Sequence, residues 1–267
     1  MYLSRLQANL TQTSAYFYKI WLITRKRTFH IFEILFWPAI GLVSVGLLTR
    51  FLTLQSNLVA FVLIGVIALS VVQIGQLDIS YVMLYSVWNK SLKQELAAPA
   101  GVLHLIVGGG ALGFIHSLVV FCLLSAFSHW AFGFQFLQPG LGPLIAFYIG
   151  LLLNAAVIGI VVCALAFRYG GRAHVGASSI VSILTLLSGI YYPVDVLPQP
   201  LKALSACLPL TYFLQYIRSF FGFEVASGSP LLVGYGLVIA YLMIVLAGLL
   251  RAVSHSKQTG VLLKMSE

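Results

Sequence analysis

Apolar stretches of membrane-spanning length recur along this chain and leave little room for any other fold. They cover, approximately, residues 29–48, 57–84, 102–127, 141–167, 175–191 and 230–250. The hydrocarbon core of a bilayer is about 30 Å thick, so a helix needs roughly 20 mostly apolar residues to cross it. The pattern therefore predicts an all-α, polytopic membrane protein with six transmembrane helices.

The composition excludes a soluble fold. Hydrophobic residues make up 60% of the 267 residues and charged residues 8%, whereas a soluble domain carries about a quarter charged residues. A soluble core cannot bury this much apolar surface, so the few charges have to mark the segments outside the bilayer.

The lysines and arginines predict the orientation, because they gather on the cytoplasmic side of membrane proteins. If both chain ends lie inside, the outer segments hold only Arg50, Lys202 and Arg218. The inner segments then hold the other basic residues, Arg5, Lys19, Arg25, Lys26, Arg27, Lys90, Lys93, Arg168, Arg172, Arg251, Lys257 and Lys264. We therefore predict a multi-pass protein of the inner or plasma membrane with both termini cytoplasmic. The net charge of +9 needs no nucleic acid partner, since no basic stripe is interleaved with aromatic residues.

The N-terminal residues predict a helix that lies on the membrane. Apolar side chains recur at helical spacing over residues 3–24, at Leu3, Leu6, Leu10, Phe17 and Ile20. Such a helix lies in the interface rather than across the bilayer. A basic run, residues 25–27, follows it. We thus expect residues 1–28 to form a cytoplasmic interfacial helix and residues 29–267 to form the transmembrane domain.

The outer segment 192–229 is semi-apolar and rich in proline. Its leucines at 197, 201, 204 and 208 fit one stripe of a short helix, and Thr211 is placed to cap a second helix. Neither helix is long enough to span. A re-entrant helical hairpin before the last span fits this pattern, because irregular backbone at membrane depth needs protein or water around it. The alternative is an amphipathic hairpin that lies on the surface and has no gating role.

A local sequence in this region resembles a known family. Residues 188–198 read Ser-Gly-Ile-Tyr-Tyr-Pro-Val-Asp-Val-Leu-Pro, and Pro-Leu-Thr-Tyr at 209–212 and Arg218 follow. This run resembles the membrane subunits of type-2 ABC exporters, which handle drugs, lipids and polysaccharides. The predicted topology resembles that of the family over the whole chain. The amino-acid sequence itself resembles the family clearly only over about residues 188–218. It implies that the re-entrant segment forms an outer gate, made of Tyr191, Tyr192, Pro193, Pro198, Pro209, Tyr212 and Arg218.

The same resemblance implies partners. Such subunits dimerise, here most simply as a homodimer, and each docks one cytoplasmic ABC ATPase, so that two ATPase copies bind the ATP and Mg²⁺. The chain contains no Gly-x-x-x-x-Gly-Lys-Ser/Thr loop, so it has no phosphate-binding loop and no cofactor of its own. The inner segment 85–101 then holds the coupling helix. The coupling residues are expected to be Trp88, Lys90, Lys93, Glu95, Arg168 and Arg172, although Lys90 and Lys93 also fit a solvated loop whose charges only enforce topology.

Polar residues inside the spans are the candidates for a translocation path, because they are costly in a membrane. The candidates are Gln73, Gln76, Asp78, Ser178, Ser182 and Thr185. Asp78 lies off the face that Gln73 and Gln76 share. Hydrogen bonding or close packing between helices explains the glutamines and the Ser178–Thr185 stripe about as well. Glu33 fits an interfacial pair with His30 or with the nearby basic cluster.

Other chemistry finds little support in the sequence. Gly108, Gly110 and Gly113 match a dinucleotide-binding spacing, but they lie inside a span with no preceding strand, so close helix packing explains them. The histidines and carboxylates have no metal or catalytic spacing, and we predict no metal site and no catalytic residue. The sequence favours a non-enzymatic permease subunit of an ATP-driven exporter. An ATP-independent channel or carrier, or a structural subunit of a membrane complex, remains the alternative.

Overall fold

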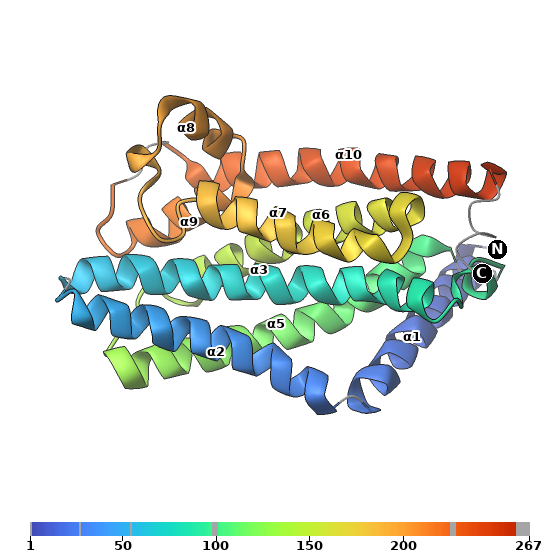
Figure 1. Ribbon diagram of the computed structural model, residues 1–267, viewed down its shortest axis with the longest axis horizontal. Coiled ribbons are helices and arrows are strands. Elements are labelled where there is room, and N and C mark those ends of the chain that lie inside the picture. Colours follow the sequence, from blue (N-terminus) through green and yellow to red (C-terminus); the bar gives the residue numbers. More distant parts are fainter. Residues whose placement is uncertain (1, 27, 54, 98–100, 225–227, 260–267) are drawn as a thin grey trace.

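The computed structural model describes residues 2–26, 28–53, 55–97, 101–224 and 228–259. Within these ranges every regular element is a helix and none is a strand, which confirms the predicted all-α class. The long helices run together along one axis (Figure 1). Both chain ends lie at the same end of this bundle, as an even number of crossings requires.

Five helices are long and apolar enough to cross a membrane: α2 (Thr28–Phe51), α3 (Ser56–Trp88), α5 (Val102–Phe132), α6 (Leu141–Tyr169) and α10 (Pro230–Thr259). The remaining predicted span corresponds to α7 (Ala173–Leu187), which has 15 residues. At 1.5 Å per residue it is about 22 Å long, short of a full bilayer core. The helix ends at Leu187, so predicted span residues 188–191 continue as irregular backbone.

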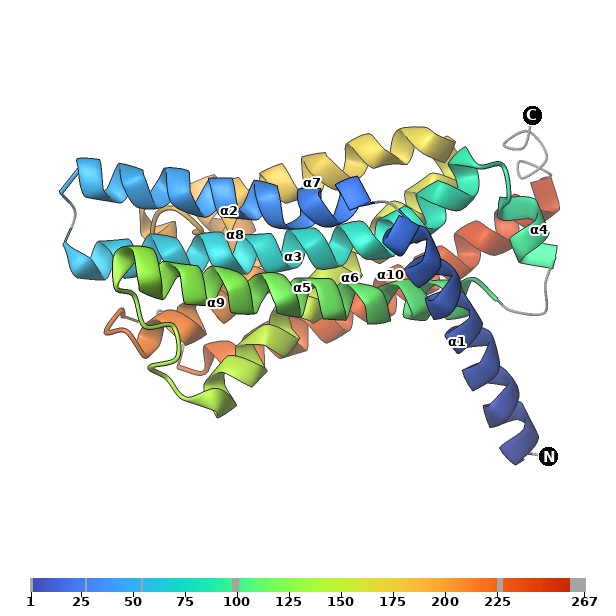
Figure 2. The same ribbon diagram turned by 90° about the horizontal axis from the view of Figure 1, so that it is seen from below.

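The helix α3 forms the centre of the bundle. Of its apolar stretch 72% is buried, against 17% for α2 and 11% for α10. It packs against α5 and α6, and α2 and α7 also contact it. Figures 1 and 2 show α2, α3 and α7 side by side on one face, with α5 and α6 behind them.

Short helices cover the end opposite the termini. They are η2 (Val194–Val196), α8 (Gln199–Ala206) and α9 (Pro209–Ser219), and Figure 1 shows α8 and α9 together there. The helix α9 is not a surface helix, because Leu210, Phe213, Leu214 and Ile217 are fully buried in the core. The proposed leucine stripe holds only in part, since Leu197 and Leu208 lie outside α8 and Leu204 is exposed.

The start of α9 differs from the prediction. Pro209 is its first residue and Leu208 the N-cap, so Thr211 lies inside the first turn rather than capping it. Proline favours this first position because its fixed φ suits a helix and its missing N–H has no partner there. The Thr211 hydroxyl donates instead to the carbonyl oxygen of Ser205, at 3.1 Å, and so ties α9 to α8.

Three elements lie at the end that carries the termini. The helix α1 (Tyr2–Lys26) leaves the bundle at a steep angle (Figure 2), while α4 (Leu92–Ala97) and η1 (Gly170–Arg172) lie in connecting segments. Both α3 and α5 extend further than predicted, to Trp88 and Phe132. Residues 85–88, expected in the polar inner segment, are therefore the last turn of α3. The left-handed backbone of Gly133, with φ of 70°, ends α5.

Candidate functional site

The carboxylate of Glu95 joins three helices at the end of the bundle that carries the termini, which the sequence predicts to be the inner end. It forms a 2.6 Å ion pair with the ammonium group of Lys19 on α1. It also accepts hydrogen bonds from the hydroxyls of Ser86, at 2.9 Å, and Ser91, at 2.8 Å. The Glu95 side chain is only 12% exposed, whereas Lys19 is 41% exposed. Glu95 therefore points into the protein and fixes the position of α4, rather than pointing outward from it.

The helix α1 is seated on α5 next to this carboxylate. A Cβ atom added to Gly108 of α5 would crowd the backbone of Tyr16 and Phe17, so the glycine allows the two helices to approach closely. Ile20 and Leu105 are buried in the same contact. Burial and the charge of Glu95 raise the pKa of the Tyr16 phenol. The predicted glycine packing is thus observed, and it holds α1 beside α4.

Trp88 belongs to an aromatic cluster that joins α3 to the start of α7. Its ring lies 5.6 Å from that of Tyr85, 6.1 Å from that of Tyr81 and 6.1 Å from the imidazole of His174. Trp88 is nevertheless 45% exposed. It can therefore contact a partner with one side while the cluster fixes its other side. His174 was not among the predicted site residues, because it lies 86 positions further along the chain and nothing in the spacing connects it to Trp88.

The other expected coupling residues that the structure describes also lie near this end. Lys90 follows α3 with a positive φ of 55°, which marks the tight turn into α4. Arg168 and Arg172 are exposed around the end of α6, and the Arg168 guanidinium lies over the ring of Tyr169. The side chains of Lys93 and Glu33 lie outside the described part of the chain.

The candidate path residues fall into two environments. Gln73, Ser178 and Ser182 are exposed, and Thr185 is half-buried. Gln76 is buried, and its Oε1 has no hydrogen-bond partner within the described residues. The α7 hydroxyls bond to carbonyl oxygens of their own helix, as Ser182 does to Ser178 at 3.0 Å, so this face presents few free polar groups. Val175, Ile183 and Leu186 are exposed beside them.

Asp78 lies away from that face. Its Oδ2 is 2.8 Å from Nδ1 of His116 on α5, and Asp78 and His116 are 8% and 13% exposed. The pair joins α3 and α5 inside the bundle. His116 was not among the predicted site residues, because it lies 38 positions from Asp78 and nothing in the spacing connects them.

Arg218 makes three side-chain hydrogen bonds at the opposite end of the bundle, which the sequence predicts to be the outer end. It is 5% exposed and donates to the carbonyl oxygens of Gly189 at 2.7 Å, Ile190 at 3.0 Å and Phe61 at 2.9 Å. Its guanidinium also stacks 3.3 Å from the centre of the Phe61 ring. One side chain of α9 thus joins α3 to the segment that follows α7.

The backbone approaches very closely at this junction. A Cβ atom added to Gly65 of α3 would overlap the carbonyl oxygen of Ile190 and crowd the guanidinium of Arg218. Only glycine therefore lets Ile190 lie against α3 without a shift. The close contact at Gly65 was not apparent from the sequence, in which it is one glycine among 24.

A cavity of about 330 Å³ lies beside Arg218. Three buried polar atoms of its lining residues have no hydrogen-bond partner within the described ranges: Ser188 Oγ, Gln215 Oε1 and Arg218 Nε. Pro193 and Tyr212 also line it. This segment therefore leaves a cavity, with polar groups in its lining, rather than a uniformly packed core.

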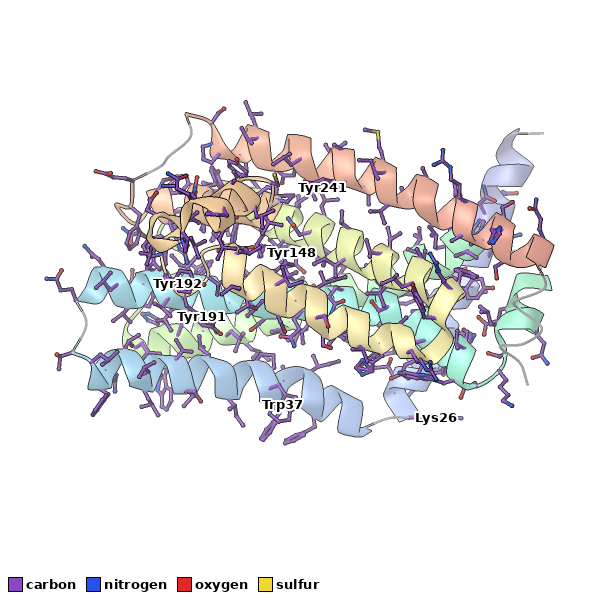
Figure 3. All side chains as sticks on the ribbon, turned by 45° about the horizontal axis from the view of Figure 1, so that its top comes forward. Lys26, Trp37, Tyr148, Tyr191, Tyr192 and Tyr241 are labelled. Atoms are coloured by element: carbon purple, nitrogen blue, oxygen red, sulfur yellow. The ribbon has the colours of Figure 1, made fainter. Side chains whose placement is uncertain are left out.

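The remaining outer residues fix the shape of this segment. Figure 3 shows Tyr191 and Tyr192 close together beyond the end of α7. The hydroxyl of Tyr192 donates to the carbonyl oxygen of Leu186 at 2.6 Å, and that of Tyr212 donates to Ala206 at 2.9 Å. Pro198 precedes α8 and Pro209 begins α9. The prolines and tyrosines named from the sequence thus lie at the turns between the end of α7 and the end of α9. These residues, 188–219, are called the outer unit below.

Metal chemistry has no visible basis in the part of the chain that the structure describes, where no three His, Cys, Asp or Glu side chains lie close enough to hold an ion. Two of the described carboxylates, Glu95 and Asp78, join helices instead.

Comparison with known proteins agrees with this arrangement. A family model described as "ABC-2 type transporter" matches residues 12–222, which is most of the chain. The match extends from α1 to the end of α9, so it includes the inner contact at Glu95 and the outer unit around Arg218. An uncharacterized protein of Archaeoglobus fulgidus is 45% identical over 58 residues, which are 22% of this chain and 91% of that protein.

Proposed function

The chain belongs to the ABC-2 type transporter family, and on that basis we propose that it is the permease subunit of an exporter powered by a separate ABC ATPase. The family membership makes it an ABC transporter permease in the membrane. The ATPase partner, the outward direction and the substrate class are our proposal. The substrate we propose is amphipathic: a lipid, a lipid-linked glycan or polysaccharide, or a drug.

The contact around Glu95 is the observation that carries this function. An ATPase that closes on ATP has to move the spans through rigid inner elements. The Lys19–Glu95 pair and the Ser86 hydroxyl join α1, α4 and the end of α3 into one such element. A push on α4 or α1 is thereby transmitted to α3, the central span. The ATPase supplies the hydrolysis, and the permease contributes two states with different affinities for the substrate.

The face formed by α2, α3 and α7 supports a path between two copies of the chain. Gln73 and the α7 stripe are exposed on a single chain, and Trp37 points outward from α2 in Figure 3. A second copy, most simply in a homodimer, would cover these side chains and enclose a seam that ATP binding opens. The outer unit around Tyr191, Pro193 and Tyr212 would then close the seam on the outside.

Purification from native membranes tests the proposal. We expect the tagged chain in mild detergent to bring down a stoichiometric nucleotide-binding protein with vanadate-sensitive ATPase activity. An inactive preparation without such a partner, from membranes that retain transport, would contradict it.

The Asp78–His116 pair favours a second candidate, an ion-coupled carrier. Titratable groups buried inside the spans are typical of proton relays, and the two side chains are 2.8 Å apart. In the exporter the pair is structural, since it joins α3 to α5 away from the exposed face.

The substitution Asp78→Asn separates the two candidates. For the exporter we expect a lower thermal unfolding midpoint, because a buried charge-assisted hydrogen bond worth about 1.5 to 3 kcal/mol is weakened. The vanadate-sensitive ATPase rate per folded complex should stay within about twofold of the wild-type rate, a difference below roughly 0.5 kcal/mol. Normal stability together with complete loss of transport would favour the carrier.

A further inference from the structure

A groove between α6 and α10 shares only Arg168 with the candidate site residues described above. Its volume is about 780 Å³, and it lies at the inner end of both helices. Its walls are apolar, with Leu165 and Val245 on opposite sides, and its rim carries Arg168, Arg251 and His255. An apolar slot with basic groups at one end matches the shape and charge of an anionic lipid.

We propose that this groove binds an anionic phospholipid, with its headgroup phosphate at Arg168 and Arg251 and one acyl chain along the apolar walls. Basic pockets between transmembrane helices are known to hold such headgroups. The inference goes beyond the transport function and depends only on the membrane-spanning fold. The proposed orientation assigns the lipid to the cytoplasmic leaflet.

The depth of the basic residues fits a headgroup. Arg168 is the next-to-last residue of α6, and Arg251 and His255 lie in the last turns of α10. Both arginines are exposed. No carboxylate among the described residues pairs with these two guanidinium groups, and a lipid phosphate would supply an anion.

A buried hydroxyl gives independent support. Ser256 lines the groove and is 3% exposed, yet its Oγ has no hydrogen-bond partner among the described residues. A buried polar group normally has a partner. A glycerol or phosphate oxygen of the lipid would provide it next to the two arginines.

The wall of the groove has room for an acyl chain. Gly248 lines it, and a Cβ atom added there would meet nothing within 4 Å. The helix α10 is also the least buried of the candidate spans, so a lipid can enter from the side. Gly236 offers a matched control: it lies on the same helix, its added Cβ also meets nothing, and it does not line the groove.

Native mass spectrometry of the purified full chain, titrated with phosphatidylglycerol or phosphatidylcholine, tests the proposal. We expect one phosphatidylglycerol to bind at least about tenfold more tightly than phosphatidylcholine, since each arginine near a headgroup contributes about 1 kcal/mol. The double variant R168Q/R251Q should lose this preference. Gly248→Leu should weaken binding of phosphatidylglycerol, and Gly236→Leu should not.

Several results would overturn the assignment. Equal binding of both lipids, unchanged preference in R168Q/R251Q, or equal effects of Gly248→Leu and Gly236→Leu would each exclude a lipid in this groove. Displacement of phosphatidylglycerol by millimolar inorganic phosphate would indicate a free-anion site instead. Thermal unfolding of each variant checks that it is folded. If R168Q/R251Q does not fold, the comparison of Gly248→Leu with Gly236→Leu still tests the proposal.

Discussion

Replacing Arg218 with leucine should destabilise the protein more than any other change at the outer end. The substitution removes three hydrogen bonds from a guanidinium to backbone carbonyl oxygens and the stacking on Phe61. We expect a loss of about 3 to 5 kcal/mol, after allowing for the cost of burying the charge. The thermal unfolding midpoint in detergent should fall by roughly 10 °C.

Two variants make the Arg218 test specific. Arg218→Lys should recover only part of the stability, because one ammonium group cannot replace a rigid fork that reaches carbonyls on two segments. Lys202→Leu removes the exposed pair with Asp195 at the same end and should change stability by less than about 1 kcal/mol. An unfolding midpoint of Arg218→Leu within 2 °C or so of the wild-type value would show that this contact does not hold the outer unit.

Reversing the charge of Glu95 should disconnect ATP hydrolysis from the spans. In Glu95→Lys two ammonium groups face each other where the structure has a 2.6 Å ion pair, so α1 and α4 separate. If loss of the pair raises the activation free energy of ATP hydrolysis by about 1.4 kcal/mol, the vanadate-sensitive ATPase rate of the copurified complex falls roughly tenfold. The folded amount should remain near normal, because the pair lies outside the buried cores of the bundle.

The double charge swap provides the control for the Glu95 prediction. In the variant K19E/E95K the ion pair can form again with its ends exchanged, so we expect at least about half of the wild-type ATPase rate to return. A swap variant as inactive as Glu95→Lys alone would mean that Glu95 acts by some contact other than Lys19. Full activity in the single variant would exclude a coupling role for the pair.

The parts of the fold that depend on the chain's periodicity were predictable. Runs of about 20 apolar residues allow few structures other than spans, and the short fifth span was visible as α7. The leucine spacing and Thr211 indicated two short helices before α10. The choice of Thr211 as a cap was wrong, because Pro209 had already set the helix start. Sequence patterns therefore predicted which segments are helical. They gave the wrong start for α9 because the preference of Pro209 for the first helical position outweighed that of Thr211 for the cap.

The contacts that form the sites were not predictable from the sequence, since their partners are distant and often backbone atoms. Arg218 binds carbonyl oxygens 28, 29 and 157 positions away, and a carbonyl carries no residue signal. Gln73 and Gln76 share a helix face by spacing, yet one is exposed and the other buried, because the edge of the α3 packing surface passes between them. Glu95 was expected to meet the partner, but it faces inward because two serines and Lys19 satisfy it.

Photo-crosslinking from α4 in native membranes tests the central claim most directly, which is that this inner element receives the motion of a separate ATPase. Gln94 is exposed on α4 beside the inward-facing Glu95, and Lys202 is exposed at the opposite end of the bundle. A photoreactive residue at position 94 should capture a nucleotide-binding protein, and the same residue at position 202 should not. Efficient capture of such a protein from position 202, or none from position 94 in transport-competent membranes, would contradict the account.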